Sequence, residues 1–312
     1  MDPLLVITNK DAGTADQDTL EVALAVLRDR TSVEVAATSD PGELDGVLHR
    51  AGSRRIVVAG GDGSLHAVVG ALHRRNQLAE AVVALLPMGT GNDFARSVGI
   101  PLEIEDAARI VIEGEVRATD LIVDEVGEIV VNNVHVGAGA EASRKGHTWK
   151  NRLGSIGIGK LNLGKLGYPI GAVQSAFNNG ELHLRVEVDG KVVNDLDRPV
   201  LMVAVGNGAH IGGGTEVTPL ADPEDGQVDV MVSRATGPLA KLGYTMKMAR
   251  EGSHLERPDV DYYRGRTVSV SGESFYCSAD GEIYGPERQR SWHVHEAAYR
   301  FVMPSAAQAV SD

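Results

Sequence analysis

The sequence predicts two domains: an N-terminal α/β domain built on a parallel sheet, and a C-terminal domain that is mostly an antiparallel β-sandwich. Two observations support this fold class. Over residues 1–125, runs of β-branched residues alternate with helical patterns, which is typical of parallel strands covered by helices. Over residues 126–297, strand-like runs dominate and helical patterns become few. We expect residues 298–312 to return to the first domain.

The first domain alternates strands and helices in a regular order. Leu20, Ala23, Leu24 and Leu27 recur with helical spacing, which predicts an amphipathic helix with one buried face. The same patterns predict strands at 4–8, 32–37, 54–60 and 81–87, and helices at 16–30, 42–52 and 65–73.

The second domain is a succession of strand-like runs. Asp189 and Gly190 interrupt one run, and this pair favours a tight hairpin because the turn needs positive φ at both central residues. Cys277 falls in another run, where we expect a strand residue and not a nucleophile. The runs are 128–139, 182–193, 198–207, 227–233, 267–272 and 274–284, and a further run at 298–304 lies in the part of the chain that we expect to return to the first domain.

Composition limits the classes of function. With 43% hydrophobic and 23% charged residues, the 312-residue chain has the composition of a globular protein. Its net charge of −13 argues against a nucleic-acid partner, which calls for a basic face. The single cysteine excludes an internal disulfide and suits a reducing compartment. Neither a signal peptide nor an apolar run of about 18 residues is evident, so we expect a cytoplasmic protein without a transmembrane segment.

Two glycine-rich corners follow the third and fourth predicted strands, "GGDGS" at 60–64 and "MGTGNDFAR" at 88–96. Ligands of parallel sheets bind at strand carboxyl ends, where glycines allow close approach and helix N–H groups can hold phosphate oxygens. Asp62 would repel a bare phosphate, which indicates a nearby metal ion. The alternative is a tight turn with Asp62 as the N-cap of the following helix. Neither the dinucleotide-binding nor the Walker motif is present, so any nucleotide is bound differently.

These corners resemble the catalytic domain of the diacylglycerol kinase family, soluble bacterial lipid kinases in particular, which is shared with sphingosine and ceramide kinases. The block "GTGNDFAR" is highly specific, whereas "GGDG" also occurs in NAD kinases and phosphofructokinases. The resemblance continues through "TDLIVD" (119–124), "VNNVHVGAGAEAS" (131–143), "GGGTEVTPLADPEDGQVDV" (212–230) and "SADGE" (278–282). It implies ATP-dependent phosphorylation of a lipid hydroxyl, with the active site in a cleft between the two domains.

The resemblance also implies roles for individual residues. Asp280 corresponds to the base that takes the substrate's hydroxyl proton, with Asp62 as the other catalytic carboxylate. Glu282 corresponds to a partner of the nucleotide or metal. The implied nucleotide contacts are Thr8, Asn9, Gly60, Gly61, Asp62, Gly63, Ser64, Gly89, Thr90 and Asn92. A structural Mg²⁺ site is implied at Asp222, Asp225 and the backbone of Gln227, linked through water to Asp62 and Asp120.

Each implied site has a simpler alternative. Without the resemblance, "DPEDGQVD" would be an acidic surface turn, and "SADGE" a hairpin turn around its Asp-Gly pair. Two positions also depart from the family pattern. Ala67 stands where relatives carry Glu, and Lys10 lies in an altered first turn, either facing phosphate or as a solvated residue.

A lipid kinase must reach a membrane, and the segment 142–180 is a candidate surface because it contains no Asp or Glu. Basic residues attract anionic lipids, and Trp suits the interfacial layer. The alternative is that its apolar residues pack under the sandwich. The predicted contacts are Arg144, Lys145, Trp149, Lys150, Arg152, Lys160 and Lys165.

Two other functions compete with a lipid kinase. One is a kinase of a soluble metabolite, similar to NAD kinase. The other is a lipid-binding regulatory protein without catalysis, for which Ala67 and the altered first turn are the only support. The sequence leaves open the lipid, the choice of ATP or GTP, and a homodimer formed by edge strands.

Overall fold

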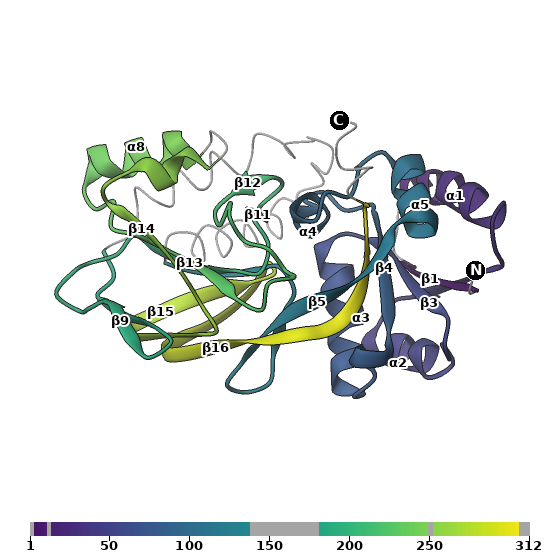
Figure 1. The fold of residues 1–312 in the computed structure, drawn as a ribbon, viewed down its shortest axis with the longest axis horizontal. Coiled ribbons are helices and arrows are strands. Elements are labelled where there is room, and N and C mark those ends of the chain that lie inside the picture. The colour runs from purple at the N-terminus through teal and green to yellow at the C-terminus, as the bar shows by residue number, and fades with distance from the viewer. Residues whose placement is uncertain (1–2, 11–13, 138–180, 249–251, 306–312) are drawn as a thin grey trace, which may run out of the picture. The chain divides into compact units, whose positions relative to one another are not determined.

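The computed structural model describes residues 3–10, 14–137, 181–248 and 252–305 (Figure 1). The chain divides into two compact units. Unit 1 contains Met1–Leu121, Pro223–Gly226 and His295–Asp312, and unit 2 contains Ile122–Asp222 and Gln227–Val294. Assignment of the short segment Pro223–Gly226 to unit 1 was not anticipated from the sequence.

Unit 1 is built on a parallel sheet with the strand order β2-β1-β3-β4-β16. Helices α1 and α5 lie on one face of the sheet, and α2 and α3 lie on the other (Figure 1). The elements are β1 (Leu4–Asn9), α1 (Thr14–Arg28), β2 (Val33–Thr38), α2 (Pro41–His49), β3 (Arg55–Gly60), α3 (Asp62–Arg74), the short helix η1 (Leu78–Glu80), β4 (Val82–Pro87), α4 (Asp93–Ser97) and α5 (Ile104–Glu113).

The predicted α/β pattern of unit 1 is confirmed, and local chemistry explains its elements. Leu20, Ala23, Leu24 and Leu27 are at most 9% exposed, so the predicted apolar face of α1 is the buried one. At α2, the carboxylate of Asp40 accepts the N–H groups of the first turn. Helix α3 begins at residue 62, earlier than expected, and α5 was not among the helices predicted from the sequence.

Unit 2 is mostly antiparallel, as predicted, with β15 pairing β7, β8 and β16. Strands β7, β10, β13 and β14 continue the sheet in that order. The elements are β6 (Ile129–Val130), β7 (Asn133–Gly137), β8 (Leu184–Val188), β9 (Lys191–Asn194), β10 (Met202–Gly206), β11 (His210–Ile211), β12 (Thr215–Glu216), β13 (Val228–Ser233), α8 (Pro238–Met248), η2 (Ser253–Glu256), β14 (Val260–Gly265) and β15 (Thr267–Ala279). Two strands continue from one unit into the other along the chain, β5 (Glu115–Asp124) and β16 (Glu282–Met303).

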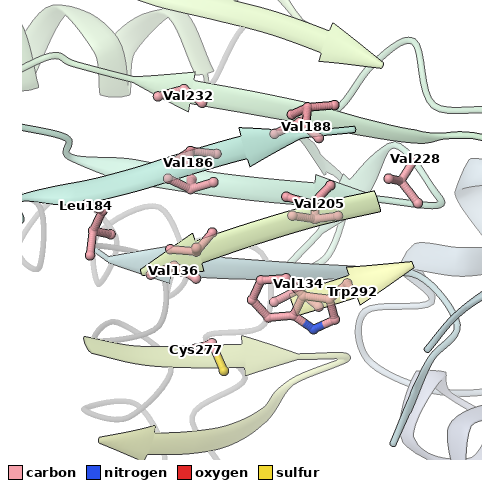
Figure 2. Packing of buried hydrophobic residues seen from close by; sticks show 14 of the residues in the cluster. Val134, Val136, Leu184, Val186, Val188, Val205, Val228, Val232, Cys277 and Trp292 are labelled. Atoms are coloured by element: carbon pink, nitrogen blue, oxygen red, sulfur yellow. The ribbon is translucent and has the colours of Figure 1, made fainter. Parts of the chain in front are cut away.

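Aliphatic side chains from seven of these strands form the core of unit 2 (Figure 2). Strand β15 contributes to this core along its whole length. It pairs β8 through Val268–Gly272 and β7 through Cys277–Ala279, with irregular pairing to β16 between these segments. A strand whose pairing is interrupted in this way can bend, so that its two halves contribute to two packed layers of sheet.

Two segments of unit 2 that were each predicted as one continuous strand are interrupted in the structure. The run 128–139 breaks at Val131 and Asn132, because their N–H groups donate to the carboxylate of Asp280 and not to a neighbouring strand. The run 274–284 reverses at Asp280 and Gly281, which join β15 to β16. The predicted hairpin at Asp189 and Gly190 is confirmed, with φ angles of 49° and 75°.

Candidate active site

The two glycine corners of unit 1 are in contact. Strands β3 and β4 are parallel neighbours, and Gly60 accepts a backbone hydrogen bond from Met88 at 3.0 Å. A Cβ on Gly61 would lie 2.8 Å from the Cα of Gly89, and one on Gly89 would lie 2.4 Å from the Cα of Gly61. No side chain fits at either position without a shift of the backbone, so the approach of the corners requires both glycines.

Asn92 fixes the shape of the second corner. Its φ of 53° is left-handed, and its Oδ1 accepts the N–H of Gly89 at 2.8 Å. Its Nδ2 donates to the carbonyl oxygens of Gly89 at 2.8 Å and Pro87 at 3.3 Å. The Asn92 amide is therefore engaged by its own loop, and the contact with nucleotide that we predicted for this residue remains a prediction.

Asp62 ties the first corner to the second. Its carboxylate oxygens accept the N–H groups of Asp93 and Phe94, each at 3.0 Å. Asp62 therefore caps α4. The alternative prediction, that it caps the helix following its own corner, is wrong, because the N-cap of α3 is Gly61 and makes no side-chain bond. Asp93 is buried beside this contact and was missing from the predicted site residues.

The remaining predicted nucleotide contacts of unit 1 lie at the same edge of the sheet. Thr8 and Asn9 end β1, and Thr8 pairs with Ala59 on β3. The hydroxyl of Ser64 lies at the first corner, where a Cβ on Gly60 would come within 2.4 Å of it. In the first turn of α3, the N–H groups of Ser64 and Leu65 both donate to the carbonyl of Gly61. A helix N-terminus that follows a strand in this way binds phosphate in other proteins.

Lys10 follows β1 and forms an ion pair with Glu43 at a distance of 2.5 Å. This contact, with hydrogen bonds from Ser39, holds the pKa of Glu43 near 2. The Lys10 side chain is 45% exposed. Of the two interpretations of Lys10, an exposed side chain paired with a neighbouring helix agrees better with this geometry.

In unit 2, Asp280 occupies a two-residue hairpin turn with a left-handed φ of 47°. Its Oδ2 accepts the N–H of Val131 at 2.7 Å, and its Oδ1 accepts those of Asn132 and Asn133 at 2.9 and 3.2 Å. The hairpin-turn alternative is thus correct as a description of the backbone. The role of Asp280 as general base stays a prediction and is compatible with this geometry, because a turn can also hold a catalytic carboxylate in a fixed orientation.

Buried asparagines support the segment that holds Asp280. Asn132 and Asn133 both donate through Nδ2 to the carbonyl of His210, at 2.7 and 3.0 Å. Asn207 donates to the carbonyl of Val131 at 2.9 Å and is 1% exposed. No role is predicted for these asparagines from the sequence, although amide side chains at the ends of otherwise apolar strands are a signal of such support.

Glu282 is connected to a buried ion pair. Its Oε2 accepts the hydroxyl hydrogen of Tyr284 at 3.2 Å, and the guanidinium of Arg290 lies 4.8 Å from the centre of the Tyr284 ring. Arg290 in turn pairs with Asp124, whose side chain is 2% exposed. Burial and the charge of Glu282 raise the pKa of Tyr284. These contacts give Glu282 a supported position beside the Asp280 turn.

Cys277 is a buried strand residue, as expected. Its side chain belongs to the core of unit 2 (Figure 2), and burial raises the pKa of its thiol to about 11. A thiol in this state is a poor nucleophile.

The predicted magnesium ligands lie on the loop that precedes β13. Asp120 holds this loop within unit 1: its Oδ2 accepts the N–H of Gly226, and its backbone N–H donates to Pro223, both at 2.7 Å. Carboxylates and a backbone carbonyl, the donors at Asp222, Asp225 and Gln227, have the chemistry that Mg²⁺ prefers. The described residues contain no cluster of three or more His, Cys, Asp or Glu side chains that could hold a metal. The magnesium site remains a prediction.

The predicted membrane contacts, all within 142–180, lie outside the described residues. In the part of the chain that the structure describes, no helix is long and apolar enough to cross a bilayer.

Comparison with known families covers almost the whole chain. The diacylglycerol kinase catalytic domain matches residues 3–123, and the YegS C-terminal NAD kinase β-sandwich-like domain matches residues 129–306. The chain belongs to the diacylglycerol kinase catalytic-domain family. The family and the fold support a lipid kinase in general terms.

Individual relatives agree with this family. A diacylglycerol kinase of Staphylococcus carnosus (strain TM300) is 27% identical over 232 residues, which cover 74% of this chain and 70% of the relative. A diacylglycerol kinase of Staphylococcus aureus (strain JH9) is 27% identical over 234 residues, covering 74% and 68%. The crystal structure of a diacylglycerol kinase from Bacillus anthracis str. Sterne shares the fold, with a TM-score of 0.75, 21% identity and 98% of each chain covered.

Proposed function

We propose that this protein is an ATP- and Mg²⁺-dependent kinase that transfers the γ-phosphate of ATP to a hydroxyl of diacylglycerol or a similar lipid. The observation that carries the proposal is the contact between the two glycine corners at the carboxyl ends of β3 and β4. The second corner bears the family's specific block at 88–96, and ligands of parallel sheets bind at this edge.

The glycine corners would position the nucleotide phosphates. Phosphoryl transfer depends mainly on the positioning of the reactants and on neutralisation of charge. Backbone N–H groups at the start of α3 can donate to phosphate oxygens, and Gly61 and Gly89 leave room for close approach. In this proposal Asp62 acts by holding α4 against the corner and not by direct contact with a phosphate.

A magnesium ion would be held by the carboxylates of Asp222 and Asp225 and by the backbone of Gln227. When bound, such an ion supplies positive charge and a rigid oxygen-ligand geometry. Asp120 would keep the loop in position through its contacts with Gly226 and Pro223.

Asp280 would act as the general base. We assign the proton to its Oδ2, which accepts one of the three backbone N–H groups, whereas Oδ1 accepts two. As the lipid oxygen forms its bond to the γ-phosphorus, its proton passes to Oδ2 and the bond to the leaving ADP breaks. Glu282 and its partner Tyr284 stand two and four residues further along β16.

A kinase of a soluble metabolite is the second candidate. It is favoured by one finding, that the matching C-terminal domain is described as NAD kinase β-sandwich-like. A non-catalytic lipid-binding protein is the weaker alternative and rests on Ala67 and the altered first turn. We further propose that this lipid kinase is a cytoplasmic protein in peripheral contact with the membrane.

The test is transfer of label from γ-labelled ATP, with Mg²⁺, to diacylglycerol in mixed micelles and, in parallel, to NAD in solution. We expect label in the lipid phase. Gly89→Ala, which forces a Cβ to within 2.4 Å of Gly61, should abolish ATP binding and transfer. Gly46→Ala on α2 is the matched control, because its Cβ would meet only the end of the Arg50 side chain at 3.8 Å.

Each other result points to a different function. Label on NAD alone would replace the lipid kinase by a metabolite kinase. If neither acceptor is labelled although the protein binds ATP, both kinase functions are contradicted. The non-catalytic, lipid-binding regulatory protein would then be the remaining candidate.

A further inference from the structure

Arg290 is a buried cation on β16, beyond the irregular part of the hairpin that begins at the Asp280 turn. Over residues 271–277 of β15 the pairing with β16 shifts twice, so the two strands lack a continuous ladder of hydrogen bonds there. The guanidinium of Arg290 pairs with Asp124 outside the hairpin and lies 4.8 Å from the centre of the Tyr284 ring. Arg290 therefore connects the turn end of β16 to another part of unit 2.

The Asp124 carboxylate is a rigid anchor for Arg290. Its side chain is 2% exposed and its Oδ2 pairs with Arg290, while its Oδ1 accepts the N–H groups of Val126 and Glu128 at 3.0 and 2.8 Å. A buried ion pair is often no more stabilising than a well-packed apolar pair, because both charges lose their hydration. Stability alone therefore does not explain why a charge is buried at this position.

The Tyr284 ring connects this anchored cation to Glu282. Its hydroxyl donates to Oε2 of Glu282 at 3.2 Å. Burial and the charge of Glu282 raise the pKa of Tyr284, so the hydroxyl stays protonated and able to donate. A cation is attracted to the face of an aromatic ring, so Arg290 restrains the orientation of the ring as well as its place. The exposed Glu282 side chain, which has many rotamers when it is free, is thereby restrained.

We propose that Arg290 and Tyr284 are positioning residues that hold the Glu282 carboxylate in one orientation for binding the magnesium–ATP complex. This inference rests on the proposed function, because the family motif implies Glu282 as a partner of the nucleotide or metal. Tyr284 binds Oε2, and no other group among the described residues forms a hydrogen bond with Glu282, so Oε1 is available to a ligand. A carboxylate that is ordered in advance loses less entropy when the ligand binds.

A second group of Arg, Asp and Tyr in unit 2 provides the matched control. Arg234 pairs with Asp261, and the Tyr263 hydroxyl donates to Asp261 at 3.0 Å. Tyr263 and Tyr284 are both half-buried against the same apolar core. The control group belongs to β14 and to the residue that follows β13, and not to the hairpin that carries Glu282.

The first test is the affinity of the full-length protein for the magnesium–ATP complex, measured by calorimetry without lipid. Tyr284→Phe removes only the hydroxyl, and we expect it to raise Kd about threefold to tenfold, because Glu282 is then no longer oriented. Tyr263→Phe removes the same atom from the control group and should stay within about twofold of wild type. Equal affinities of Tyr284→Phe and wild type would overturn the proposal.

A double-mutant cycle separates positioning from a general loss of structure. If Tyr284 acts through Glu282, Tyr284→Phe should change the affinity by less than about twofold once Glu282 has been replaced by Ala. A merely structural role of Tyr284 would weaken binding by the same factor with and without the Glu282 carboxylate, and that result would overturn the proposal.

Arg290 is tested by two variants. Arg290→Met alone leaves the Asp124 charge buried, so it is combined with Asp124→Asn, which keeps an oxygen to accept the N–H groups of Val126 and Glu128. Urea unfolding verifies that this double variant is folded. Arg290→Lys keeps the charge but loses the planar group over the Tyr284 ring. We expect both variants to raise Kd by about the same factor as Tyr284→Phe; wild-type affinity in both would overturn the role of Arg290.

The outcomes separate this inference from the proposed function. If wild type phosphorylates diacylglycerol and Tyr284→Phe binds magnesium–ATP as tightly as wild type, the kinase stands and the positioning role fails. If Tyr284→Phe weakens magnesium–ATP binding but wild type transfers no phosphate to diacylglycerol, the proposed lipid kinase fails and the positioning role is supported.

Discussion

Two Asp-Gly hairpins of unit 2 share a backbone geometry and differ in their surroundings. The pair at Asp189 joins β8 to β9, and the pair at Asp280 joins β15 to β16. The aspartates have φ angles of 49° and 47°, and the glycines that follow have 75° and 89°. Local sequence therefore determines the turn equally well in both places, and it does not distinguish their functions.

The difference lies in what each carboxylate contacts. At an exposed position, Asp189 accepts the N–H groups of Arg266 and Thr267, each at 2.8 Å. Asp280 accepts three N–H groups from a segment that buried asparagines support. The first hairpin makes a structural contact at an edge, whereas the second holds the carboxylate that the family motif identifies. The following predictions test whether that contrast is one of function.

The largest effect should come from removing the charge of each aspartate. Asp280→Asn should lower kcat for lipid phosphorylation by roughly 10²–10⁴, the contribution of a general base. Asp189→Asn should change it by less than about twofold. Initial rates with γ-labelled ATP measure both; similar losses in the two variants would mean that the hairpins do not differ in function.

The next largest effect should come from removing a buried asparagine that supports the chain near each hairpin. Asn207 donates to Val131 at 2.9 Å, and Asn194 donates to Leu184 at 2.8 Å; each asparagine is 1% exposed. Replacing either by Ala should cost about 1–3 kcal/mol of unfolding free energy. Only Asn207→Ala should also lower kcat, by roughly tenfold, through misplacement of Asp280. Urea unfolding and steady-state rates test this pair, and an unchanged kcat in Asn207→Ala would count against the supporting role.

A smaller effect is expected at the glycines. A Cβ on Gly190 or Gly281 would meet nothing within 4 Å, so the cost of Ala is that of a left-handed backbone, about 1 kcal/mol in each case. The two stability losses should match, while activity should fall only in Gly281→Ala. Unequal losses in urea unfolding would show that the turns are less alike than their φ angles indicate.

The smallest effect concerns acid stability. Burial pushes the pKa of Asp189 upward, but hydrogen bonds from Thr267 and Arg266 hold it below its ordinary value. A lowered pKa in the folded state adds stability that is present above the unfolded pKa and is lost as the pH falls through the folded pKa. Wild type should therefore lose more unfolding free energy than Asp189→Asn as the pH falls below about 4. Unfolding free energies that fall in parallel with pH for wild type and Asp189→Asn would contradict this prediction.

The sequence predicted the parts of the fold that depend on local periodicity. Strands β1 to β4 and the buried face of α1 follow from runs and spacings that adjacent residues encode. Helix α8 was not predicted, because its apolar residues lie on both the buried and the exposed side and therefore do not form the pattern of a single apolar face. The break at Val131 escaped because it depends on a carboxylate 149 residues away.

The candidate site divides in the same way. The motifs identified Asp62 and Asp280, but the structural contact of each could not be predicted from spacing. Asp62 caps a helix that begins 31 residues later, and Asp280 holds a segment of another strand pair. Such contacts are set by tertiary packing, which a local pattern does not encode.

The most direct test of the central claim is a single-turnover measurement with ATP already bound. Wild type and Asp280→Asn would be loaded with γ-labelled ATP and Mg²⁺, their ATP affinities compared, and diacylglycerol in micelles added. We predict similar affinities, label in the lipid with wild type, and a transfer rate lower by roughly 10² or more in the variant. Transfer at the wild-type rate by Asp280→Asn would contradict the account, because the second hairpin would then be as purely structural as the first.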